Sequence, residues 1–148
     1  MHKIINCERI FYMGFFGLFK KKKVQLTQAQ LQWNKLWELW TRGEVESPYA
    51  ELMTYQSEIN NGGHVQYFSN MENTGDLQKE MAVLESTLPL GLIQNLQSAY
   101  KTYLESKEPD EDDDDGYDGA FAYFDDVYYE NEDFITKRLE QRAEKVEL

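Results

Sequence analysis

The chain has 148 residues, of which 41% are hydrophobic and 14% aromatic, so it can bury the core of one domain. With 27 acidic and 15 basic residues its net charge is −12, a charge that repels phosphates and argues against direct DNA or RNA binding. The single Cys7 excludes an internal disulfide, and two histidines make a poor metal site. We therefore expect a cytoplasmic protein without a metal ion or cofactor.

Residues 1–25 form an apolar and basic segment ahead of the domain expected at residues 26–148. The apolar part, residues 4–19, is shorter than the roughly 20 residues that span a bilayer, and its positive charges follow instead of preceding it, unlike those of a secretory signal. Phe15, Phe16 and residues 18–23 would suit a membrane surface, but we expect no membrane contact. We hypothesise that translation starts at Met13 and that residues 1–12 are a misannotated start.

Helical periodicity covers most of the remaining chain, and no alternating β pattern competes with it. Thr27 and Gln30 form a capping box that predicts a helix start, and Gly43 marks the end of that helix. Ser47 and Pro48 predict the next start, as N-cap and first-turn proline. Three tryptophans on the first helix, at positions 33, 37 and 40, are expected to anchor the core.

Further helices are expected at about 64–72, 76–88, 92–104, 121–129 and 132–146. Residues 108–119 are expected to form an acidic loop. The sequence thus predicts an all-α fold: a single compact domain of about six to seven helices.

The run from Glu58 to Asn70 is the most distinctive part of the sequence. Its two adjacent glycines lower helix propensity by about 1 kcal/mol each and permit positive φ, so we expect a sharp turn. A helix from His64 would then align His64, Phe68 and Met71 on one side. The two amides of Gln66 and Asn70 would be neighbours on another side. The candidate pocket residues are Glu58, Asn60, Asn61, Gly62, Gly63, His64, Gln66, Tyr67, Phe68 and Asn70.

Two interpretations of this run compete. The polar side chains could hold a small ligand, with Glu58 and His64 as an acid/base pair. The favoured interpretation is structural: Asn60 and Asn61 cap the broken helix ends, and the later amides satisfy exposed backbone groups. No nucleophile or phosphate-binding loop accompanies the run, so we expect no enzymatic activity and assign no catalytic residue.

The run also resembles the DMP19-like family of bacterial proteins. The resemblance rests on residues 58–63, on Gln66, Tyr67, Phe68 and Asn70, and on the downstream sequence Phe124-Asp125-Asp126-Val127-Tyr128-Tyr129; it covers about residues 31–139. It implies an all-helical fold and, from the family's named member, a DNA mimic that sequesters a transcriptional regulator. The acids that would perform mimicry are not part of the shared motif, so they have to be judged by their charge and position.

Acidic residues concentrate in the C-terminal half of the chain. The candidate partner-binding residues are Asp110, Glu111, Asp112, Asp113, Asp114, Asp115, Asp118, Asp125, Asp126 and Glu130. A DNA mimic needs carboxylates at fixed positions, and ordering a loop costs about 1–2 kcal/mol per residue, so acids on helices would have to contribute. The alternative is a solvated loop that aids solubility. Aligning either Gly116 or Gly119 with the EF-hand glycine breaks the EF-hand pattern, so we expect no dedicated calcium site, although weak cation binding stays open.

The sequence therefore predicts an acidic helical module that binds a basic protein. In the more specific form of this hypothesis, the chain mimics DNA and the partner is a DNA-binding regulator. One alternative is an immunity-type protein that neutralises a basic toxin; another is a small-molecule binder or enzyme with a pocket around His64. A homodimer is compatible with the sequence.

Overall fold

The computed structural model describes residues 24–107 and 116–148, with only the backbone described at 116–118. The hypothetical start at Met13, the apolar and basic run that follows it, and the acids at 110–115 lie outside the described residues. Within them the fold is all-α, as predicted, with five helices and no strand. In chain order the helices are α2 (Gln28–Thr41), α3 (Tyr49–Thr74), α4 (Leu77–Thr87), α5 (Leu90–Ser106) and α6 (Gly116–Ala143).

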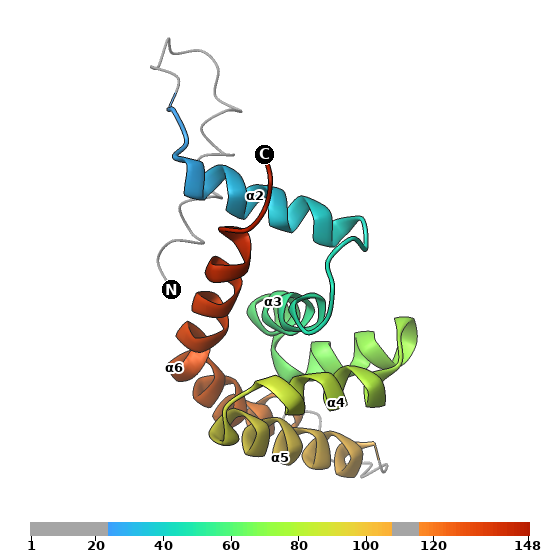
Figure 1. Ribbon diagram of the computed structural model, residues 1–148. Coiled ribbons are helices and arrows are strands. Elements are labelled where there is room, and N and C mark those ends of the chain that lie inside the picture. Colours follow the sequence, from blue (N-terminus) through green and yellow to red (C-terminus); the bar gives the residue numbers. More distant parts are fainter. Residues whose placement is uncertain (1–23, 108–115) are drawn as a thin grey trace, which may run out of the picture.

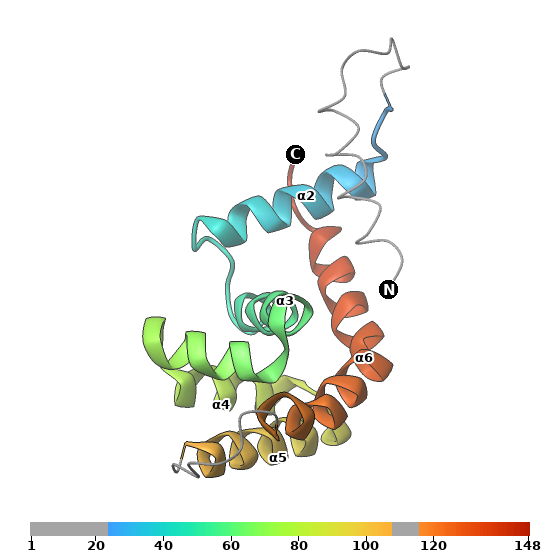
Figure 2. The ribbon, with the colours of Figure 1, turned by 180° about the vertical axis from the view of Figure 1, so that it is seen from behind.

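Helix α6 is the element that joins the others. It runs along one side of the molecule and packs on α3, α5 and α2, while α4 packs on α3 (Figure 1). The view from behind shows α2 crossing α6 near the C-terminal end of α6 (Figure 2). The side-chain amide of Gln32 fixes this crossing, because its Nε2 donates to the backbone oxygens of Glu144 at 3.0 Å and Val146 at 3.1 Å.

Local signals place the helix starts of α2 and α4 as predicted. Thr27 Oγ1 accepts from the backbone N–H of Gln30 at 3.2 Å, and Gln30 Oε1 accepts from that of Thr27 at 2.8 Å, which completes the capping box. Gly43 follows the end of α2 with a φ of +69°. Asp76 caps α4 through the backbone N–H of Lys79, at 3.2 Å.

The prediction for the start of α3 is wrong in its details. The helix begins at Tyr49, so Pro48 is the N-cap and not a first-turn residue, and Pro48 supplies no side-chain cap. The hydroxyl of Ser47 does not cap the backbone; it donates to the carboxylate of Glu51, one helical turn further on.

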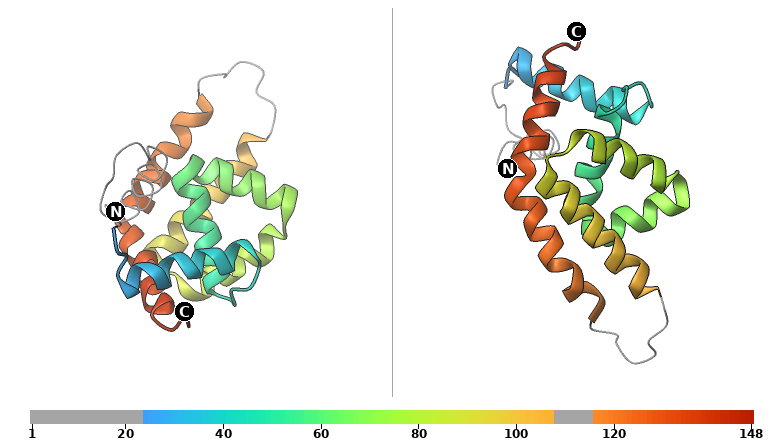
Figure 3. Two further views of the ribbon diagram at one scale, coloured as in Figure 1. Left: turned by 90° about the horizontal axis from the view of Figure 1, so that it is seen from above. Right: turned by 60° about the horizontal axis from the view of Figure 1, so that its bottom comes forward.

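The C-terminal half departs further from the prediction. Instead of two helices preceded by a loop to residue 119, α6 is one continuous helix that already includes Gly116 (Figure 3). No glycine or proline occurs between residues 120 and 143. The side chain of Asn131 lies at the predicted break and donates to the carbonyl of Val127 at 2.8 Å, one turn back, so it does not interrupt the helix. This merger, together with the counting of α3 as one helix across Gly62 and Gly63, explains why five helices are described, not six to seven.

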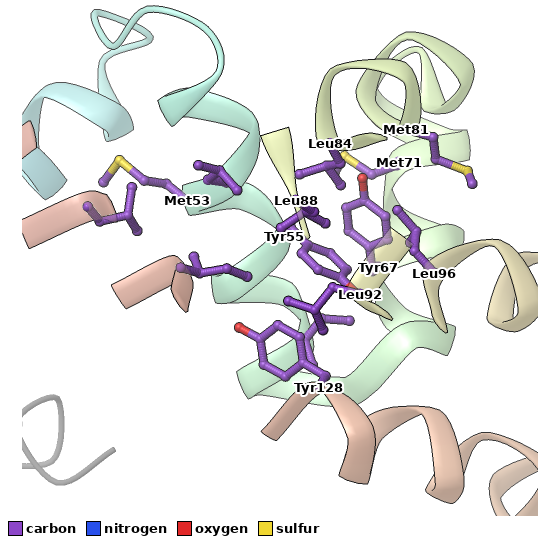
Figure 4. Packing of buried hydrophobic residues seen from close by; sticks show 14 of the residues in the cluster. Met53, Tyr55, Tyr67, Met71, Met81, Leu84, Leu88, Leu92, Leu96 and Tyr128 are labelled. Carbon is purple, nitrogen blue, oxygen red and sulfur yellow. The ribbon is translucent and has the colours of Figure 1, made fainter. Parts of the chain in front are cut away.

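The core lies where α3, α4, α5 and α6 meet. Tyr55, Tyr67 and Tyr128 are fully buried, with the ring of Tyr55 at 5.0 Å from that of Tyr67 and 5.3 Å from that of Tyr128, both in T-shaped contact (Figure 4). Leucines of α4 and α5, including Leu84 and Leu92, pack around these rings.

The tryptophans of α2 differ from the prediction. All three are only half-buried and pack against the edge of the core, and the one fully buried residue of α2 is Leu36. None of the helices in the described ranges combines the length and the apolar character that crossing a membrane requires.

Candidate functional site

The site is built around a break within α3. Gly62 (φ −157°, ψ 15°) and Gly63 (φ 74°, ψ −172°) leave the helical conformation, and the helix resumes at His64. Only Gly63 has a φ in the left-handed region, which residues with a side chain rarely adopt. The sharp turn predicted from the paired glycines is therefore confirmed, and it splits α3 into two parts.

The second part of α3 receives its N-terminal cap from α6. A new helix start exposes backbone N–H groups and the positive end of the helix dipole. Asp125 Oδ1 accepts from the backbone N–H of His64 at 3.0 Å and contacts His64 Nδ1 at 2.7 Å. A carboxylate 61 positions away in sequence thus does the work that a neighbouring N-cap residue does at an ordinary helix start.

Gly63 also makes room for this cap. A Cβ built on Gly63 would lie 2.5 Å from Asp125 Oδ2, far closer than a van der Waals contact allows. Position 63 therefore requires glycine for two reasons: its backbone angle, and the close approach of α6.

His64 extends the network into the core. It is fully buried, and its Nε2 lies 2.8 Å from the hydroxyl of Tyr55, which is also fully buried. Burial raises the pKa of Tyr55 well above its usual value, so the phenol keeps its proton and can donate it to Nε2 in the tautomer that carries the imidazole proton on Nδ1. In that tautomer Nδ1–H donates to Asp125 Oδ1, so both ring nitrogens of His64 have a partner.

Glu58 ties the two parts of α3 together. Its Oε2 accepts from Gln66 Nε2 and from Asn70 Nδ2, both at 2.8 Å. The less favoured alternative, an acid/base pair of Glu58 with His64, is not formed, because the two side chains have different partners. The expectation that these amides satisfy backbone groups is wrong for the same reason.

A second carboxylate of α6 holds the first part of α3. Glu132 is 5% exposed, and its Oε1 accepts from Asn60 Nδ2 at 2.7 Å. Gln56 Nε2 lies nearby and donates to Thr136 Oγ1 at 2.9 Å. Asn60 thus binds α6 instead of capping a helix end, whereas Asn61 is exposed.

A pocket of about 420 Å³ opens beside the break. Its lining residues are Gly62, Val65, Gln66, Ser69, Asn70, Phe121 and Asp125. Three of the ten predicted pocket residues therefore line it. His64, Tyr67 and Phe68 are fully buried and belong to the core.

The sequence prediction missed the contribution of α6 to the site. Phe121 and Asp125 form part of the pocket wall, and Asp125 had been assigned only to an acidic partner-binding surface. The signal was available, because the resemblance rests on two motifs and Asp125 lies in the second. The structure brings these two motifs into contact. In the described parts of the chain, no group of three or more His, Cys, Asp or Glu side chains could hold a metal ion.

The remaining acids of α6 divide by their surroundings. Asp126, Glu130 and Asp133 are exposed, whereas Glu132 is buried and Asp125 is partly buried, and these two contact α3. The sequence has no lysine, arginine or histidine from residue 116 to residue 136. Of the other predicted acids, residues 110–115 and the side chain of Asp118 lie outside what the structure describes.

Comparison with known proteins identifies a family. The model of a family described as DMP19-like protein matches residues 45–146, more than half of the chain, and leaves out α2. No curated protein and no solved structure matches the chain. The matched region includes the broken helix α3, the acids of α6 that hold it and the pocket between them. The chain belongs to the DMP19-like protein family.

Proposed function

We propose that this chain binds a basic protein through the exposed carboxylates of α6, and that the partner is a DNA-binding regulator whose DNA these carboxylates mimic. One observation carries the proposal: Asp126, Glu130 and Asp133 are exposed on a stretch of helix without a single basic residue. Such a surface attracts a basic partner and repels nucleic acid.

The spacing of these acids supports a phosphate-like row. Asp126, Glu130 and Asp133 are separated by four and three residues, so they share one face of the helix and span about 10 Å along its axis. A duplex carries about one charge per 1.7 Å of axis over both strands, so three acids are sparser than one strand. The six acids at positions 110–115, shortly before α6 in sequence, would raise the charge density.

The geometry around His64 favours binding over catalysis. His64 and Tyr55 are both fully buried, and both ring nitrogens of His64 contact groups of the core or of α6. A substrate could not reach these atoms without separating α3 from α6. We therefore assign the network a structural role and propose no chemical step.

The test is capture of a partner on the immobilised chain from an extract of the source cells. We expect a captured basic protein that is released both by raised salt and by added duplex DNA. The triple variant D126N/E130Q/D133N should lose it. The matched control E44Q/E85Q/E105Q removes the same charge from exposed positions elsewhere and should retain it.

Two outcomes would favour other functions. A partner that salt releases but duplex DNA does not would point to an immunity-type protein that neutralises a basic toxin. The pocket beside the α3 break supports a second candidate, a small-molecule binder. If binding of the captured molecule does not depend on salt but is lost in Q66A, the result would favour the small-molecule binder and contradict the role of the α6 acids.

A further inference from the structure

The orientation of two amides determines the chemistry of the pocket. A carboxylate can only accept hydrogen bonds, so Glu58 requires the NH₂ groups of Gln66 and Asn70 to face it. Their carbonyl oxygens must then point away from Glu58. Both residues line the pocket. Gln66 Oε1 lies beside Gly62, only 2.1 Å from the position that a Cβ added to Gly62 would take.

Asp125 adds a charged acceptor to the same wall. Its Oδ1 is occupied by the two contacts with His64. Oδ2 has no hydrogen-bond donor among the residues that the structure describes, and the side chain of Asp125 is 25% exposed. With Glu58 directly behind the two amides, the pocket has two carboxylates nearby and no lysine, arginine or histidine in its lining.

We propose that this pocket receives a guanidinium group, and that it is an arginine side chain of the basic partner; this assignment rests on the proposed function. A guanidinium carries five N–H donors in one plane and no acceptor, which complements acceptors arranged around a common space. It can bridge Asp125 Oδ2 and Gln66 Oε1, with the buried side chain of Phe121 contributing to the wall beside it.

Nuclear magnetic resonance titration with N-acetyl-arginine amide tests the chemistry. We expect saturable shifts of the backbone amide signals of Gly62, Val65 and Ser69. N-acetyl-citrulline amide has nearly the same shape without the charge and should bind about tenfold more weakly. The assignment is overturned if these signals do not move, or if the citrulline probe binds equally well.

Two variants test whether the arginine probe binds in this pocket. Q66M keeps the length of the side chain but removes the acceptor, and should weaken binding of the arginine probe about fivefold. Q97M makes the same change at an exposed position of α5 and should have no effect. Equal binding by Q66M and the unmodified chain contradicts the site, and the citrulline comparison still decides the charge requirement if Q66M does not fold.

Partner capture separates this inference from the proposed function. D126N/E130Q/D133N should bind the arginine probe normally while it loses the partner. Q66M should retain the acidic surface but capture the partner several-fold less well. If capture by Q66M equals that of the unmodified chain, the pocket does not receive a side chain of the partner, and the role of the α6 acids still stands.

Discussion

Gly63 shows how one residue controls the contact between α3 and α6. Its φ lies in the left-handed region, and a Cβ added to it would collide with the carboxylate of Asp125. Any side chain there would strain the backbone and also push α6 away from the helix start that it caps.

We expect G63A to lower the free energy of unfolding by about 2–4 kcal/mol. The matched control is G91A in the first turn of α5, where an added Cβ meets no atom within 4 Å. That change should leave stability unchanged or raise it by up to about 1 kcal/mol. Urea unfolding followed by far-ultraviolet circular dichroism measures both. Equal effects of the two changes would contradict the role of Gly63.

Glu80 lies in a small cluster of buried oxygen atoms between α3 and α4. The Oε2 atoms of Glu51 and Glu80 and the hydroxyl of Tyr67 are buried, and none has a hydrogen-bond partner among the described residues. Burial first, and the charge of Glu51 second, raise the pKa of Glu80 above its ordinary 4.5. The folded chain therefore binds this proton more tightly than the unfolded chain.

The free energy of unfolding should accordingly fall as pH rises from 4.5 through the raised pKa of Glu80. E80Q has no proton to lose, so it should flatten this part of the pH profile and be more stable than the unmodified chain at pH 7. E85Q, an exposed change on the same helix, controls for the loss of one charge. Urea unfolding across the pH range gives the comparison. A less stable E80Q at pH 7 would show that this carboxylate is stabilising.

At the scale of elements, α6 acts as a brace for both parts of α3. Glu132 binds the first part, Asp125 caps the second, and the hydroxyl of Tyr129 donates to the carbonyl of Ile59 at 3.0 Å just before the break. The brace includes two buried polar side chains, Glu132 and His64, each of which depends on its partner across the interface.

E132A should therefore cost about 2–3 kcal/mol of stability, because it removes a buried carboxylate that accepts from the amides of Asn60 and of the buried Gln56. E130A, two positions earlier but exposed, should change stability by no more than about 0.5 kcal/mol. Thermal unfolding of the two variants measures the difference. If both changes cost the same, Glu132 is not part of the brace.

Local sequence signals predicted where helices begin and break better than they predicted which distant residues contact one another. The Thr27 capping box, Asp76 as a helix start and the glycine break are properties of short segments, and the structure has all three. The contact of His64 with Asp125 joins positions 61 apart, and no periodicity connects them. The unbroken course of α6 was missed because exposed acids weaken the apolar pattern without interrupting the helix.

For the whole molecule, the net charge of −12 is the dominant electrostatic feature. Mutual repulsion of like charges destabilises a compact state, and salt screens it. Salt also weakens surface ion pairs such as Arg142 with Glu46, but each exposed pair contributes only about 0–1 kcal/mol.

We therefore expect the thermal midpoint to rise by a few degrees as sodium chloride is increased at neutral pH. Differential scanning calorimetry across a salt series would show it, with a non-ionic osmolyte as the control for general solute effects. A midpoint that falls with salt would mean that specific ion pairs outweigh the net repulsion.

The cap supplied by Asp125 has a consequence for the order of folding and opening. Residues 64–74 make a helix too short to persist alone in water, and its cap is available only after α6 has docked. Amide protons in this stretch should thus exchange with solvent together with those of α6, and not with the first part of α3 to which they are covalently joined. Helix α3 is then divided between two cooperative unfolding units, and the boundary between them lies at Gly62 and Gly63.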